Sequence, residues 1–122
     1  MDIQKSNPLK EKSYFFALSV VKTCQFLVNE KKEYVISKQL LRSGTSIGAN
    51  VEEANQAESK ADFIHKLSIA NKEANETHYW LRILRDTNYL DSETTNGLLL
   101  SCEELLKILT ASIKSAKQNL KQ

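Results

Sequence analysis

Helix-breaking residues are almost missing from this chain. Its 122 residues contain one proline and three glycines, which are Pro8, Gly44, Gly48 and Gly97. Because proline and glycine destabilise a helix interior more than other residues do, nearly the whole length is free to be helical and turns must be few. A chain of this length is expected to form a single core. We therefore expect an all-α fold in one domain over residues 1–122, with residues 1–8 as a loose N-terminal lead-in.

Apolar residues recur at steps of three and four along four segments, which is the spacing of one helical face. The segments run from about residue 9 to 29, from 34 or 37 to 54, from 59 to 86 and from 92 to 120. Phe15, Phe16 and Phe26 widen the apolar face of the first. The last segment has the cleanest stripe, which consists of Leu98, Cys102, Leu105, Leu109, Ile113, Ala116 and Leu120. Four helices joined by short turns predict an antiparallel up-down-up-down four-helix bundle.

Two glycines fall inside the second predicted helix. Its core stripe is Ile36, Leu40, Gly44, Ile47, Val51 and Ala54, and Gly48 lies between two of these positions. One interpretation is a helix break at Ser43-Gly44-Thr45. The other is a continuous helix, which we favour because the apolar phase is the same before and after the glycines. Small residues there would let a second helix approach closely.

Helix-capping residues mark the start of the last two segments. The Ser59 hydroxyl can accept a hydrogen bond from the amide of Asp62, which is how serine caps a helix. Asp91 or Ser92 is the expected cap of the final helix.

Charge and hydropathy say more about location than about function. Lys and Arg number 17 against 15 Asp and Glu, and the charges are interspersed, which is weak support for a nucleic-acid partner. No apolar run of 18 residues occurs, and residues 1–10 do not resemble a signal peptide, so we expect a soluble, cytoplasmic protein. Cys24 and Cys102 lie on apolar faces, where reduced cysteine acts as a small hydrophobic residue.

The sequence offers no catalytic or metal-binding constellation. Asp62-x-x-His65 is the nearest match to the Glu-x-x-His element of a di-iron bundle. Such a site needs two of these elements, and the sequence contains no second one. His65 and His78 are 13 residues apart, about 20 Å along a helix, and cannot share a metal. No serine or cysteine has a base nearby in sequence. We therefore expect a protein that is not an enzyme and needs no cofactor.

A polar stripe runs beside the core stripe of the second helix. It contains Gln39, Arg42, Ser46, Asn50 and Glu53, while Glu73 and Glu76 occupy a comparable place on the third helix. If these helices form a hairpin, Arg42 meets one of the glutamates. A partly buried network of this kind fixes helix register, which is the role we favour over contact with a ligand or nucleic acid.

Two further groups of residues are candidate surfaces. Ile69, Trp80 and Ile83 form a second apolar face on the third helix, which suits either packing within the bundle or an interface between subunits. Lys107, Lys114, Lys117 and Lys121 form a basic ridge opposite the apolar stripe of the last helix. A solvated face is the ordinary explanation of such a ridge, and phosphate binding is the alternative.

Residues 41–54, 62–70 and 72–81, with the elements Ser46-Ile47-x-x-Asn50 and Glu73-x-x-Glu76, resemble the bacterial four-helix bundle family named for proteins encoded in 23S ribosomal RNA intervening sequences. The resemblance implies an antiparallel bundle that assembles into a ring-like homopentamer. It also implies a relation to accessory proteins of diversity-generating retroelements that bind nucleic acid, and it brings no known reaction. Two functions follow as expectations: a self-assembling scaffold that binds RNA or DNA, or a protein-binding adaptor that does not.

Overall fold

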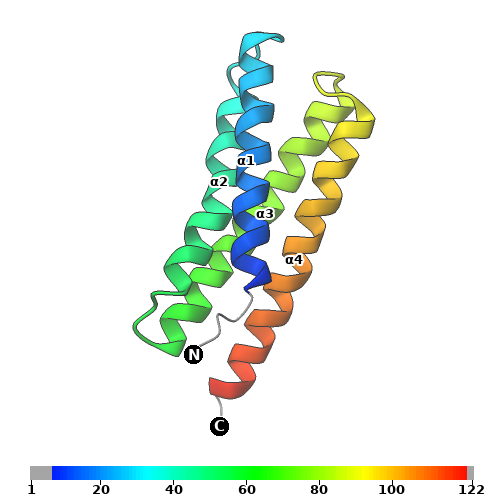
Figure 1. The fold of residues 1–122 in the computed structure, drawn as a ribbon. Coiled ribbons are helices and arrows are strands. Elements are labelled where there is room, and N and C mark those ends of the chain that lie inside the picture. The colour runs from blue at the N-terminus through cyan, green and yellow to red at the C-terminus, as the bar shows by residue number, and fades with distance from the viewer. Residues whose placement is uncertain (1–6, 121–122) are drawn as a thin grey trace.

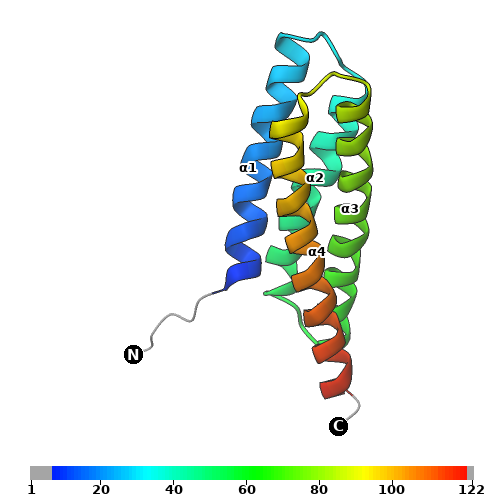
Figure 2. The same cartoon turned by 90° about the vertical axis from the view of Figure 1, so that its right-hand side faces the viewer.

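The computed structural model describes residues 7–120, which form four helices and no strand (Figure 1). The helices are α1 (Pro8–Asn29), α2 (Ile36–Ala54), α3 (Lys60–Asp86) and α4 (Ser92–Leu120). Each helix runs antiparallel to the next, and α1 also packs against α4 to close the bundle (Figures 1 and 2). The predicted all-α four-helix bundle is confirmed.

Side chains cap the helices at their starts. The Asn7 side chain accepts a hydrogen bond from the amide of Lys10 at 3.1 Å. Pro8 is the first residue of α1, a position where its missing N–H costs nothing, so the predicted lead-in extends one residue too far. Residues 1–6 lie outside the described part of the chain.

The later caps agree with the sequence. The Ser59 hydroxyl accepts from the Asp62 amide at 3.0 Å. Of the two candidates for α4, Asp91 is the cap, because its carboxylate accepts from the Thr94 amide at 2.8 Å.

Helix α2 is continuous through both glycines, as the apolar phase predicts. Gly44 is buried against α1, and a Cβ atom placed on it would lie 2.8 Å from Val20 Cγ1. A Cβ on Gly48 would lie 3.3 Å from the Ser13 carbonyl oxygen. The glycines therefore let α1 and α2 approach more closely than any larger residue would permit.

The buried stripe of α4 differs from the predicted one at both ends. Thr95 and Leu99 are buried while Leu98 is only partly buried, so the core-facing side is rotated at the start of the helix. Leu120 was expected in the core and is 53% exposed. The reason is helix length: α4 extends well past the start of α1 (Figure 2), so its last turns have no α1 beside them.

Both cysteines are buried and unpaired. The Cys24 thiol donates to the Ser37 carbonyl at 3.3 Å, and the Cys102 thiol donates to the Ala74 carbonyl at 3.2 Å. Burial raises the pKa of Cys24 to about 11 and that of Cys102 to about 12. Both thiols are therefore protonated at neutral pH and pack as small apolar groups.

Candidate functional site

Arg42 joins α2 to α3 at the outer edge of their interface. Its Nη1 atom lies 3.0 Å from Glu73 Oε1, and its Nη2 atom donates to the Glu76 carboxylate. Glu76 also accepts a hydrogen bond from the indole N–H of Trp80 at 2.9 Å. Glu73 is the more enclosed of the two acids, with 16% of its side chain exposed. One guanidinium thus neutralises two carboxylates that would otherwise repel each other one turn apart on α3.

Gln39 is the one other member of the polar stripe that joins this cluster, because its side-chain oxygen accepts a hydrogen bond from Arg42 Nη2 at 3.4 Å. Asn50 donates to the carbonyl and the hydroxyl oxygen of Ser46, one turn earlier on α2, at 2.9 and 3.1 Å. Glu53 pairs separately with Lys66 at 2.8 Å. The structure therefore divides the predicted network into three separate contacts, and only the Arg42 and Glu53 contacts cross to α3.

A buried hydroxyl pair in the same interface is not evident from the sequence pattern. Ser43 and Thr77 are fully buried, and their hydroxyl oxygens lie 2.9 Å apart. The Thr77 hydroxyl oxygen also lies 2.7 Å from the Glu73 carbonyl oxygen. In the sequence Thr77 sits in an apolar stripe, where threonine resembles valine in shape. The one available signal was that Ser43 falls next to the core stripe of α2.

The apolar face of Ile69, Trp80 and Ile83 is partly buried within the chain. Trp80 packs against the core, and its indole N–H donates a hydrogen bond to the Glu76 carboxylate. Several large apolar side chains are exposed, among them Val35 before α2 and Leu100 on α4. Four of them lie on α1, namely Tyr14, Phe15, Leu18 and Phe26, which we call the α1 apolar face; the exposed fraction of Phe15 is 63%. The expectation that Phe15 and Phe26 widen the core face of α1 is wrong, because at 100° per residue they lie on a different side of the helix from the buried Val20 and Leu27.

Three of the four predicted ridge lysines, Lys107, Lys114 and Lys117, are exposed on α4. They take part in none of the ion pairs formed between described residues. Lys121 lies outside the described residues.

Two of these lysines line a groove between α3 and α4. The groove has a volume of about 550 Å³. Its lining, which we call the α3–α4 groove, consists of Ser68, Asn71, Thr110, Ile113, Lys114, Lys117 and Gln118. The lining combines two ammonium groups with hydroxyl and amide groups and contains no carboxylate. This combination of positive charge and hydrogen-bond donors is suited to an anion.

The histidines and acidic residues do not assemble into a metal centre in the described part of the chain. His78 Nε2 lies 2.9 Å from Glu103 Oε2, across the α3–α4 interface, and His65 is exposed. Within residues 7–120, no three His, Cys, Asp or Glu side chains come together as metal ligands would. None of the helices described is long and apolar enough to cross a membrane.

Similarity to known proteins covers most of the chain. A family described as "23S rRNA-intervening sequence protein" matches residues 5–111. A crystal structure of a protein with unknown function from the S23 ribosomal protein family of Bacteroides thetaiotaomicron VPI-5482 shares 55% sequence identity, with a TM-score of 0.86. That similarity covers 87% of this chain and 98% of the Bacteroides chain. No functionally curated protein matches significantly. The chain belongs to the 23S rRNA-intervening sequence protein family.

Proposed function

We propose that this protein is a non-enzymatic, self-assembling scaffold of the cytoplasm that binds RNA or DNA along α4. The observation that supports this most is the basic face made by Lys107, Lys114 and Lys117. These side chains are exposed, and none is neutralised by a carboxylate among the described residues. The α3–α4 groove beside them adds hydroxyl and amide donors that phosphate oxygens accept from.

The expected affinity of one chain is low, which is why self-assembly belongs to the proposal. Three phosphate contacts give a shallow dependence on salt, about a 20- to 40-fold loss of affinity between 50 and 200 mM. Copies held in one assembly would bind the same strand together, which raises the overall affinity without any new contact. The family resemblance suggests five copies in a ring. The α1 apolar face and the Ile69, Trp80 and Ile83 face are the candidate contacts between copies.

The test of nucleic-acid binding compares two charge-matched triple variants. One carries Lys107→Gln, Lys114→Gln and Lys117→Gln on α4. The control carries Lys22→Gln, Lys31→Gln and Lys38→Gln, three exposed lysines on or beside α1 and α2. Fluorescence anisotropy with labelled RNA and DNA strands, at 50 and 200 mM salt, measures the affinity.

We expect the α4 variant to lose at least tenfold in affinity at 50 mM salt and to show a weaker salt dependence, because fewer counterions are released. The control variant should lose much less. Equal losses in the two variants would mean that net charge alone attracts the strand, and would refute the α4 site.

A second candidate function is a protein-binding adaptor, favoured by the α1 apolar face. Exposed aromatic side chains such as Phe15 and Phe26 are typical of protein interfaces. Light scattering on the Phe15→Gln, Phe26→Gln variant separates the roles of this face. A smaller particle with normal helix content would place self-association there. An unchanged particle would leave the face open for another protein.

A further inference from the structure

Two adjoining cavities open at the end of the bundle where α1 begins. The inner cavity, of about 530 Å³, has apolar walls that include Leu9, Val51 and Leu67. The outer cavity, of about 760 Å³, lies between the α2–α3 turn and the last turns of α4. Asn55, Phe63 and Ser112 line both, so the two cavities adjoin, and we refer to them together as the hollow.

The hollow results from unequal helix lengths. Helix α1 begins at Pro8, which lines the inner cavity, whereas α4 continues to Leu120 (Figure 2). Beyond Pro8 the inward side of α4 therefore faces no α1 residue. Its lining residues there are small, namely Ala111, Ser112, Ser115, Ala116 and Asn119, and they are too short to fill the missing corner. The space is thus a product of the architecture, and it adjoins core residues that are almost fully buried.

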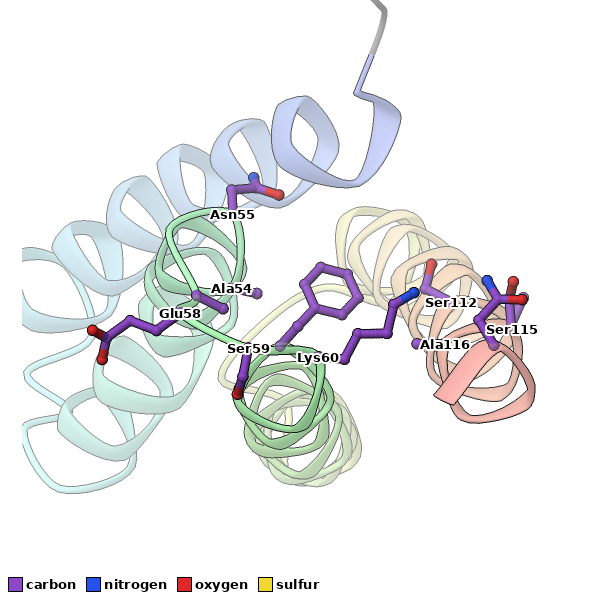
Figure 3. Close-up of a pocket in the computed structure, with 12 residues that line it drawn as sticks. Ala54, Asn55, Glu58, Ser59, Lys60, Ser112, Ser115 and Ala116 are labelled. Atoms are coloured by element: carbon purple, nitrogen blue, oxygen red, sulfur yellow. The ribbon is translucent and has the colours of Figure 1, made fainter. Parts of the chain in front are cut away.

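The chemistry of the hollow changes from one end to the other. Ile108 and the walls named above make the inner cavity apolar. At the outer cavity Lys60 extends across the opening toward Ser112, whereas the carboxylate of Glu58 is directed away from it (Figure 3). Among the described residues that line either cavity, Glu58 is the only acid. Lys60 forms no ion pair with any residue between 7 and 120.

We propose that this hollow binds a linear aliphatic carboxylate, of the class of medium-chain fatty acids. The alkyl chain lies in the inner cavity against Leu67 and Phe63, and the carboxylate lies at Lys60 with the Ser112 and Ser115 hydroxyls as further donors. One ammonium group matches a single negative charge. A phosphate polymer does not fit, because the apolar walls would offer its charges no partners. Each cavity by itself, at about 530 and 760 Å³, has the volume of a typical small-molecule site.

The binding test uses the purified full-length chain and calorimetric titration with decanoate, below the concentration at which it forms micelles. We expect saturable binding with one ligand per chain. Each methylene added between hexanoate and decanoate should raise the affinity about fourfold, because each buries apolar surface in the inner cavity. Decanol, which has the same tail without the charge, should bind more weakly. Absence of saturable binding, or an affinity that does not depend on chain length, would overturn the proposal.

Two variants test the two ends of the hollow separately. Lys60→Gln should weaken decanoate binding about fivefold and leave decanol binding unchanged, since it removes only the attraction of an exposed charge. Lys38→Gln, on the outer side of α2, is the matched control and should change neither. Ser112→Leu places a larger side chain where the cavities meet and should abolish binding of both ligands, with circular dichroism verifying the fold. Equal effects of Lys60→Gln and Lys38→Gln, or full binding by Ser112→Leu, would refute the assigned site. Lys60 and Ser112 are not part of the basic face of α4. The outcome of these tests is therefore independent of the nucleic-acid proposal.

Discussion

The hydroxyl oxygens of Ser43 and Thr77 lie 2.9 Å apart in the α2–α3 interface, and neither side chain is exposed to solvent. Each hydroxyl therefore depends on the other and on nearby helix carbonyls for its hydrogen bonds. The pair is a polar contact in an otherwise apolar layer, between Leu40 and Ile47 on one helix and Ala74 and Leu81 on the other. A polar contact in such a layer favours one alignment of the two helices over shifted alternatives.

Replacing Thr77 with Val should destabilise the protein by about 1–3 kcal/mol. The shape of the side chain is kept, but the Ser43 hydroxyl loses its buried partner. Urea unfolding at neutral pH gives the free energy of unfolding. The double variant Ser43→Ala, Thr77→Val should be less destabilised than the sum of the two single variants. Additive effects would mean that the two hydroxyls do not interact.

Gly44→Ala and Gly97→Ala should change stability in opposite directions. Alanine favours a helix by about 1 kcal/mol over glycine at either position. At Gly44, however, the new methyl group meets the branched side chain of Val20 at 2.8 Å, and overpacking of this kind costs about 1–3 kcal/mol. At Gly97 a new Cβ meets no atom within 4 Å among the described residues. Thermal unfolding of both variants tests this, and a stabilised Gly44→Ala protein would show that α1 can move away at little cost.

The Glu33 carboxylate makes the start of α2 sensitive to acid. It accepts hydrogen bonds from the amides of Ile36 at 3.0 Å and Ser37 at 2.7 Å. Burial alone would raise the pKa of Glu33, but these bonds outweigh it and hold the pKa below its ordinary value. A lowered pKa in the folded state means that the stabilisation is present above the pKa of the unfolded chain and is lost as the pH falls through the folded pKa.

Glu33→Gln should therefore be less stable than the original chain at pH 7, by about 1 kcal/mol for a weakened cap. The difference should shrink as the pH falls below the ordinary pKa of a glutamate, about 4.3, and through the lower pKa of folded Glu33. Urea unfolding between pH 3 and pH 7 measures it. Glu30→Gln is the control, since Glu30 is exposed and its side chain takes no part in these bonds. A difference that is constant with pH would argue against the charge as the cause.

Arg42→Ala should alter assembly more than stability. The guanidinium is about half exposed, so each of its ion pairs contributes little to folding, about 0.5–1 kcal/mol. Its removal leaves Glu73 and Glu76 facing each other without a counter-charge, which should shift α3 and the Trp80 ring beside it. We expect altered tryptophan fluorescence and a changed particle mass in light scattering, with normal helix content. A variant that folds and assembles unchanged would contradict a structural role for this network.

Local signals in the sequence predict most of the fold. The apolar phase of α2 is unbroken across Gly44, and the caps at Ser59 and Asp91 need only neighbouring residues, so a single sequence is enough to place them. The two errors have different causes. Leu120 continues the periodicity of α4, but its exposure depends on where α1 begins. Phe15 is apolar, but at 100° per residue it lies on a different side of α1 from the buried Val20 and Leu27, so its apolar character alone was a misleading signal.

The candidate sites, like the fold, were predictable only in part. Opposite charges on adjacent helices made the Arg42 contact with Glu73 and Glu76 predictable. Which members of the polar stripe reach α3 depends on side-chain length and on competing partners within α2, as Asn50 and Ser46 show. The hollow beside Phe63 had no sequence signal, because it results from the unequal lengths of α1 and α4.

The buried thiols offer a direct way to follow how the bundle comes apart. Cys24 bonds across the first hairpin, from α1 to α2, and Cys102 bonds across the second, from α4 to α3. A thiol-specific reagent reaches either sulfur only after its own hairpin has opened. If mass spectrometry finds both sites labelled at one rate, the two hairpins separate in a single cooperative event. Faster labelling of one site would instead identify the hairpin that opens first, and with it the order in which the two hairpins unfold.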